Sequence, residues 1–169
     1  MPAEIIVNAA PGEIFVHRNI ANMVIATDLN CLSVIQFAVD VLKVNHVIVC
    51  GHYNCGGVRA ALNRQRPGLT LTNKWLMHIK DIYRVHRAEI ESLPSEDQKV
   101  NRLVELNVVE QVHRLSHTSI IQGAWKRDQR PMLHGWVYAL DDGLIKRLIT
   151  LPPGSPLDAI YQYDDVSEA

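Results

Sequence analysis

One short apolar stretch, at residues 47–50, constrains the fold of this chain more than any other feature. Val47, Ile48 and Val49 precede Cys50, and a glycine-rich polar loop follows at residues 51–57. A short, β-branched run without polar interruption is typical of a strand that is covered on both faces of a parallel sheet. A second β-branched run occupies residues 13–17, and we expect it to form another buried parallel strand.

The segment between these two runs predicts a helix. Its apolar residues recur at three- and four-residue spacing, at Leu32, Ile35, Val39 and Leu42, and Asp28 stands where an N-cap is expected. Strand, helix and strand form a βαβ unit. Because ligands of open α/β sheets bind at the carboxyl ends of strands, the loop at residues 51–57 is the first place to look for a site.

The remaining segments complete an α/β architecture. Helices are expected over residues 58–62, 73–91 and 96–115, the last with Ser95 and Gln98 at capping-box spacing. Residues 132–140 and 144–151 predict a hairpin across an Asp-Asp-Gly turn. We therefore expect one domain over residues 1–151, with a mainly parallel central sheet flanked by helices and a C-terminal hairpin. Residues 152–169 read as a tail that packs on the surface or is partly mobile.

Composition excludes several classes of partner. The 169 residues carry 17 Lys and Arg against 18 Asp and Glu, so no excess of positive charge is available for nucleic acid or an anionic membrane surface. No basic and apolar leader opens the chain, and no stretch approaches the roughly 18 apolar residues of a membrane span. The three cysteines are too few for a disulfide framework. We expect a cytoplasmic protein.

His52 and Cys55 are the candidate metal ligands. They are three residues apart on one loop, so an imidazole nitrogen and a sulfur could reach the same Zn²⁺ ion. Cys55 also precedes a predicted helix, where free N–H groups favour a thiolate. Two ligands do not complete a four-coordinate shell. A buried thiol beside a hydrogen-bonded imidazole, or a nucleophilic Cys55 next to His52, therefore remain alternatives.

Two longer motifs carry a family resemblance. Residues 17–22 (HRNIAN) and 50–57 (CGHYNCGG) resemble signature stretches of the β-class carbonic anhydrases, and residues 2–4, 11–13, 105–108 and 134–138 also resemble this family in the same order. The resemblance implies Zn²⁺ held by two cysteines and one histidine, with His52 and Cys55 as the second and third ligands. It also implies hydration of CO2 to bicarbonate by zinc-activated water, and assembly as a homodimer or homotetramer.

The same resemblance implies a substrate pocket. Phe15, Ile20 and Phe37 match positions that line a small apolar pocket for CO2, and the Gly56 amide would lie beside the metal. The family often has tyrosine at the position of Phe37, so a hydrogen-bonding group would be missing there. Ordinary core packing of the three apolar side chains is the alternative.

Arg18 and Tyr138 match two residues that hold an inhibitory bicarbonate in an allosteric subgroup of the family. That subgroup completes the site with a tryptophan, which would lie before Met1. In the alternative interpretation, Arg18 pairs with a carboxylate and Tyr138 packs in the hairpin.

The sequence departs from the family at its start. The family's Cys-x-Asp-x-Arg stretch, which supplies the first zinc ligand and a catalytic Asp-Arg dyad, would precede residues 2–4 and does not occur in the sequence. We therefore assign no catalytic residue. An internal Met taken as the start, a deliberate truncation or a shortened paralogue would each explain this boundary. Cys50 could replace the missing ligand, because it lies two residues before His52 in an extended run, or it could pack in the core.

The expected function is that of a zinc-dependent carbonic anhydrase. The alternative is a truncated, catalytically silent homologue that acts as an assembly or regulatory subunit.

Overall fold

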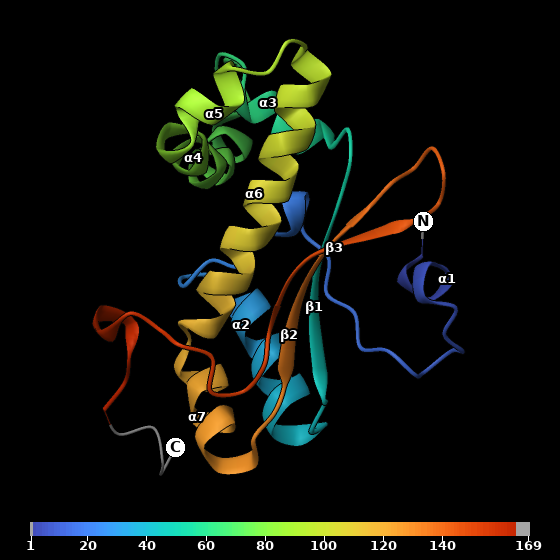
Figure 1. The fold of residues 1–169 in the computed structure, drawn as a ribbon, viewed down its shortest axis with the longest axis vertical. Coiled ribbons are helices and arrows are strands. Elements are labelled where there is room, and N and C mark those ends of the chain that lie inside the picture. Colours follow the sequence, from blue (N-terminus) through green and yellow to red (C-terminus); the bar gives the residue numbers. More distant parts are fainter. Residues whose placement is uncertain (1, 165–169) are drawn as a thin grey trace.

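The computed structural model describes residues 2–164, which form a three-stranded sheet with helices packed on it (Figure 1). The helices and strands are α1 (Ala3–Val7), α2 (Leu29–Gln36), β1 (His46–His52), α3 (Gly56–Ala61), α4 (Thr70–Val85), α5 (Arg87–Glu91), α6 (Glu96–Ser116), α7 (Ser119–Asp128), β2 (Met132–Tyr138) and β3 (Ile145–Leu151). A π-helical turn (Phe37–Val41) continues α2, and short 3-10 turns occupy Ile20–Asn22 and Ala159–Tyr161.

The sheet has the order β1-β2-β3. β1 runs parallel to β2, with Val49 opposite Gly135. β2 and β3 form the antiparallel hairpin, with a register irregularity between Gly135 and Trp136. The α/β class and the C-terminal hairpin are therefore confirmed. Within residues 2–164 the sheet is mixed, with one parallel and one antiparallel pairing.

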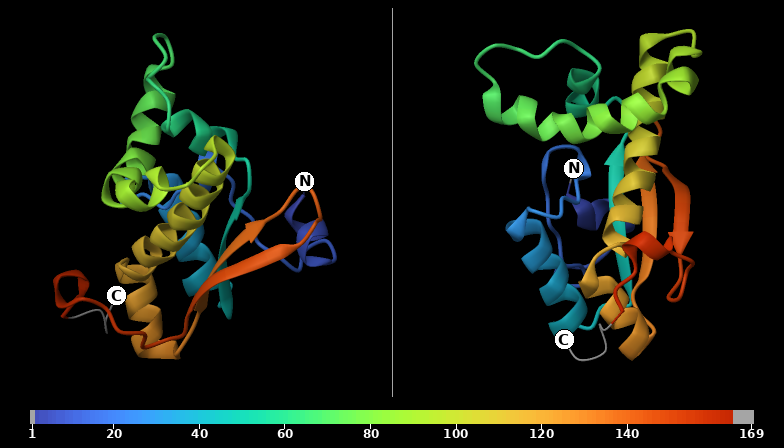
Figure 2. Two further views of the ribbon diagram at one scale, coloured as in Figure 1. Left: turned by 45° about the horizontal axis from the view of Figure 1, so that its top comes forward. Right: turned by 90° about the vertical axis from the view of Figure 1, so that its left-hand side faces the viewer.

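α6 covers one face of the sheet (Figures 1 and 2). The Ser95 side chain caps it by accepting a hydrogen bond from the Gln98 backbone N–H, as the capping-box spacing predicts. Its predicted apolar face is buried: Val100, Leu103, Val104, Val108, Val112 and Leu115. Gly51 and Gly135 let this helix approach closely, since a Cβ built on either would lie 3.0 Å or less from a methyl group of Val108.

Two predictions about the strands are wrong. β1 is covered on one face, and His46, Ile48 and His52 on the other face are exposed. Residues 14–19 form no strand, and Phe15 in this segment is 50% exposed. β-branched residues favour an extended backbone, but a strand also needs a neighbour to accept its hydrogen bonds. Within the described chain β1 is the edge of the sheet, and residues 13–17 do not pair with it.

The helices differ from their predicted bounds at three places. α3 begins two residues earlier than expected. The helix expected over residues 73–91 begins at Thr70 and is interrupted at His86, which has non-helical dihedral angles and separates α4 from α5. α7 was not predicted at all. Its N-cap is Thr118, whose hydroxyl accepts a hydrogen bond from the Ile121 N–H at 3.3 Å.

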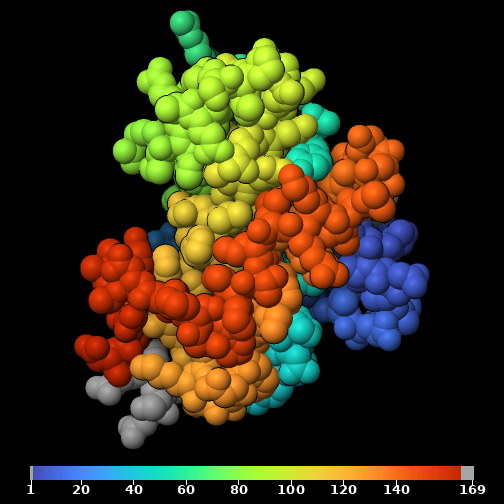
Figure 3. All heavy atoms as spheres, in the orientation of Figure 1, coloured from blue at the N-terminus to red at the C-terminus, as the bar shows by residue number. Residues whose placement is uncertain are grey.

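The two ends of the described chain lie on opposite sides of the molecule. The N-terminal segment, blue in Figure 3, forms a projection beside the hairpin. The C-terminal segment packs on α6 and α7, where the Gln122 amide donates to the Tyr161 carbonyl and the His117 and Tyr161 rings stack at 3.9 Å. Residues 165–169, the acidic end of the predicted tail, are outside the described residues. None of the described helices is long and apolar enough to cross a membrane.

Candidate metal centre and substrate pocket

The β1–α3 loop, counted as residues 52–55 so that it includes the last residue of β1, lies at the carboxyl end of this parallel strand, where the sequence predicted a site. The Tyr53 N–H donates to the Tyr138 carbonyl at 3.0 Å, which extends the pairing of β1 with β2. Asn54 turns the chain in the left-handed region, with φ of 57°, a conformation that asparagine tolerates. The Asn54 N–H donates to the Asn101 side chain at 2.8 Å. Backbone contacts to β2 and α6 therefore fix the loop.

Glu105 on α6 anchors the same loop through side chains. Its carboxylate accepts hydrogen bonds from the Tyr53 hydroxyl at 2.6 Å, the Lys146 ammonium at 2.7 Å and the Arg102 guanidinium at 2.8 Å. Burial raises the pKa of Glu105, but the hydrogen bonds from Lys146, Tyr53 and Arg102 outweigh it and hold this pKa below its ordinary value. Burial and the hydrogen bond to Glu105 raise the pKa of Tyr53, so its hydroxyl stays a donor.

His52 presents one ring nitrogen for a ligand. Its side chain is exposed, and Nδ1 lies 2.9 Å from the Tyr53 carbonyl oxygen. Because a carbonyl can only accept, Nδ1 carries a proton in this contact, so in the neutral imidazole it is Nε2 that has the free lone pair. Metal-binding histidines commonly use this arrangement, which fixes the tautomer and the ring orientation. The geometry of His52 therefore fits a metal ligand.

Cys55 supplies the sulfur. It is 6% exposed and is the N-cap residue of α3. A Cβ built on Gly57 would lie 3.8 Å from its Sγ, so the glycine keeps the space beside the sulfur open. Imidazole nitrogen and thiolate sulfur are ligand types that zinc takes, and the pair supplies two of the four positions of a zinc shell.

Cys50 is partly buried on the same face of β1 as Ile48 and His52, and it is not part of the hydrophobic core. It is two residues before His52 on β1, and its Sγ donates to the Gly51 carbonyl at 3.5 Å. Burial raises the pKa of the Cys50 thiol, which opposes the thiolate that a metal requires.

The structure places the predicted pocket residues in two groups, an aromatic pair and an isoleucine beside α3. The rings of Phe15 and Phe37 lie 5.9 Å apart in a tilted arrangement. Ile20 lies beside the start of α3, since a Cβ built on Gly57 would be 3.0 Å from its Cγ2. Phe15, Ile20 and Phe37 are about half exposed, at 50%, 53% and 47%, which argues against ordinary core packing. Gly56 has open space around it, with no atom within 4 Å of a built Cβ.

The predicted bicarbonate residues are not joined in the structure. Arg18 is exposed, and among residues 2–164 it has no hydrogen bond or ion pair. Tyr138 is buried at the end of β2, and a Cβ built on Gly143 in the hairpin turn would lie 3.7 Å from its hydroxyl. Tyr138 thus packs in the hairpin, Arg18 pairs with no carboxylate among residues 2–164, and the role of the two residues in binding bicarbonate stays a prediction.

Sequence reasoning gave Glu105 no role in the site. The signal available was a glutamate between Val104 and Leu106 in a long helix, since a charged residue is unusual beside residues that pack against a sheet.

Comparison with known proteins assigns the family. A family model described as carbonic anhydrase matches residues 1–145. A β-carbonic anhydrase from Coccomyxa, solved with acetazolamide, has a TM-score of 0.85 and 38% identity, with 90% of this chain and 68% of that chain covered. The chain belongs to the β-class carbonic anhydrase family.

Other carbonic anhydrases agree with this assignment. A carbonic anhydrase from Emericella nidulans is 47% identical over 91% of this chain and 67% of its own length. One of two tetrameric β-carbonic anhydrases from Sordaria macrospora has a TM-score of 0.84 and 36% identity, with 89% of this chain and 76% of that chain covered. This β-carbonic anhydrase chain thus spans two thirds to three quarters of the length of these three relatives.

Proposed function

We propose that this protein is a zinc-dependent carbonic anhydrase that catalyses the reversible hydration of CO2 to bicarbonate and a proton. The observation that carries the proposal is the contact between His52 Nδ1 and the Tyr53 carbonyl at 2.9 Å. It leaves Nε2 as a metal ligand on a loop that also holds Cys55.

His52 and Cys55 would hold the ion. Bound zinc lowers the pKa of a coordinated water to about 7 and so supplies the nucleophile at neutral pH. The other protein ligand and the Asp-Arg dyad of the family belong to a Cys-x-Asp-x-Arg stretch that the sequence does not contain. The Glu105 contacts support the role of the loop, because a ligand pair must be held rigidly to bind a metal well.

The apolar residues near the loop would receive the other substrate. Phe15, Ile20 and Phe37 would line a pocket that accepts CO2 and excludes water. The Gly56 N–H, in the first turn of α3, would orient an oxygen of CO2 or bicarbonate, since the first N–H groups of a helix have no partner within it. Arg18 and Tyr138 would contribute to a second bicarbonate site.

We also propose assembly as a homodimer or homotetramer in the cytoplasm. The exposed face and free edge of β1, which includes Ile48 at 40% exposure, support assembly. The three free cysteines support a reducing compartment. Light scattering on the purified protein would measure the molar mass of the assembly in solution. A monomer at all protein concentrations would contradict the assembly proposal.

The enzyme proposal is tested by zinc content and by stopped-flow CO2 hydration. We expect bound zinc and hydration in the protein, and loss of both in His52→Ala and Cys55→Ser. Cys50→Ser is the matched control, because it removes a thiol on β1, two residues before His52, to which the proposal gives no ligand role, and it should keep both. Hydration that persists without His52 and Cys55 would refute the proposal.

The second candidate is a catalytically silent subunit. It rests on the two zinc ligands that the residues given supply, His52 and Cys55, because a shell left with two protein ligands would bind zinc weakly. A folded oligomer that binds no zinc and hydrates no CO2 would support the silent subunit over the enzyme.

A further inference from the structure

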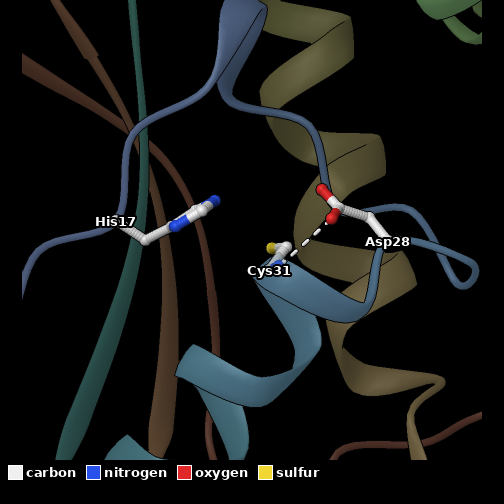
Figure 4. A group of neighbouring side chains, drawn as sticks. All are labelled: His17, Asp28 and Cys31. Carbon is white, nitrogen blue, oxygen red and sulfur yellow. Dashed lines mark hydrogen bonds between the residues drawn. The ribbon is translucent and has the colours of Figure 1, made fainter.

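Three potential metal ligands converge at a place that the proposed carbonic anhydrase site does not use. His17 belongs to the extended segment before Ile20, while Asp28 and Cys31 belong to the start of α2. One ligand atom from each of the three lies within 4.8 Å of the others. Figure 4 shows the three side chains turned toward one another. We name this group the N-terminal cluster.

His17 supplies the first reason to expect a ligand there. Its Nε2 is buried and has no hydrogen-bond partner among the described residues. A buried polar atom without a partner destabilises a fold, so such an atom needs a physical explanation. In Figure 4 the ring points into the space in front of Cys31 and Asp28. A ligand in that space would give Nε2 a partner.

Asp28 holds its carboxylate beside the same space. Its Oδ1 accepts hydrogen bonds from the Asn30 N–H at 3.1 Å and the Cys31 N–H at 3.3 Å, as the N-cap of α2. This cap fixes the carboxylate within reach of the Cys31 sulfur. A carboxylate oxygen that is oriented by backbone N–H groups loses little freedom when it binds a cation.

Cys31 completes the set with a buried sulfur. It is 4% exposed, and its Sγ has a long contact of 3.9 Å to the Met23 carbonyl. Burial and the charge of Asp28 raise the pKa of this thiol, so a cation would have to displace its proton to the solvent. A metal ion supplies the positive charge that makes this loss of the proton favourable.

We propose that His17, Asp28 and Cys31 form a binding site for a zinc-type divalent cation, made of residues different from His52 and Cys55. Nitrogen, carboxylate oxygen and sulfur are the three donor types that zinc takes. Ligand atoms around one zinc ion lie about 3.5 Å apart. Small side-chain rotations that shorten the present separations, all within 4.8 Å, would therefore bring the three ligand atoms to this spacing. A water molecule takes the fourth position.

The ion would connect the extended segment at residues 14–19 with the start of α2. His17 lies two residues after Phe15, and α2 leads into Phe37, whose ring lies 5.9 Å from that of Phe15. An ion bound to His17 and Cys31 would therefore also fix this aromatic pair. The role is structural, and we expect zinc to raise the thermal unfolding temperature of the protein.

The test uses cobalt(II) as a spectroscopic probe in the Cys50→Ser/Cys55→Ser variant. Cys31 is then the remaining cysteine, and a thiolate-to-cobalt charge-transfer band reports its coordination. We expect the band to appear and to vanish when Cys31→Ser is added. His17→Gln and Asp28→Asn should each weaken cobalt affinity at least about tenfold. Asparagine still caps a helix, so Asp28→Asn removes the charge and keeps the fold.

Two results would overturn the site: no charge-transfer band in the Cys50→Ser/Cys55→Ser variant, or a band that His17→Gln leaves unchanged. Circular dichroism checks that each variant is folded. If the serine variants do not fold, anomalous diffraction at the zinc edge from the unsubstituted protein decides, and a zinc-soaked crystal without a peak among the three side chains refutes the proposal. Because the cobalt test removes Cys55, its result is independent of the carbonic anhydrase proposal.

Discussion

Glu105 is the residue on which the position of the β1–α3 loop depends most directly. Three donors from three elements converge on its carboxylate: Tyr53, Arg102 and Lys146. The Glu105 side chain is 12% exposed, so water replaces lost partners only in part. A change at this residue should therefore affect both stability and the loop that carries His52 and Cys55.

We expect Glu105→Gln to lower the free energy of unfolding by about 1–3 kcal/mol, because the amide offers one acceptor oxygen and turns an N–H group toward the remaining donors. Urea denaturation measures the change. Glu110→Gln is the control, since Glu110 pairs with Arg114 at 3.2 Å and its side chain is 43% exposed. That variant should lose less than about 1 kcal/mol. Equal losses in the two variants would contradict the assigned role.

The depressed pKa of Glu105 also predicts a pH dependence. A carboxyl group that ionises more readily in the folded state stabilises the fold fully above its unfolded pKa, about 4.3, and loses this contribution as the pH falls through the folded value. We expect the protein to lose stability faster than Glu105→Gln as the pH falls below about 4.3. Urea unfolding midpoints measured across this pH range give the slope of stability against pH for the unsubstituted protein and for Glu105→Gln. Equal slopes for the two proteins would refute the prediction.

At the residue scale, the sequence predicted what lies close together along the chain. His52 and Cys55 share one loop, so their spacing alone suggested a pair of ligands. Glu105 lies 52 positions from Tyr53, and no local pattern connects them. His17 is separated from Asp28 and Cys31 by the Ile20–Asn22 turn, so only the tertiary structure brings the N-terminal cluster together. The roles of His52, Cys55 and the pocket residues stay predictions.

α6 packs closely on β1 and β2 at Gly51 and Gly135, which have no side chain to hold the helix away. A Cβ on Gly135 would lie 2.7 Å from Ile149 Cγ2 and within 3.1 Å of methyl groups of Val108 and Val112. These neighbours are β-branched and lie on both β3 and α6, so they have few alternative rotamers. The close packing of α6 on the sheet depends on the missing side chain.

We therefore expect Gly135→Ala to destabilise the protein by about 1–3 kcal/mol through overpacking. Thermal or urea unfolding measures this. Gly56→Ala is the matched control: no atom lies within 4 Å of its built Cβ, and alanine favours the helix that begins there. The control should be neutral or slightly stabilising. A Gly135→Ala variant as stable as the control would show that α6 can shift away from the sheet without cost.

Strong local signals predicted most elements. α6 has a cap and a long apolar face, and the hairpin has a turn between two alternating runs. α7 has a Thr118 cap but a weak apolar pattern, because it is ten residues long, contains Gly123 and buries the polar Gln122. The break at His86 and the missing strand at residues 13–17 depend on neighbours that sequence periodicity does not report.

Across the whole molecule, three histidines bind protons less readily in the folded state than in the unfolded chain. Burial lowers the pKa of His78, His117 and His134. They lie on α4, after α6 and on β2, so their effects are spread over separate parts of the fold. Their contributions should therefore add.

We expect stability to fall on mild acidification. Above the ordinary histidine pKa of about 6.5 these groups are neutral in both states, so their contribution is complete. As the pH falls through this value, the unfolded chain takes up protons first, and stability decreases until the lower folded pKa values are reached. Urea midpoints between about pH 7.5 and pH 5.5 would show the decline. Replacing all three histidines with glutamine should flatten it, and an unchanged slope would place the acid sensitivity in other groups.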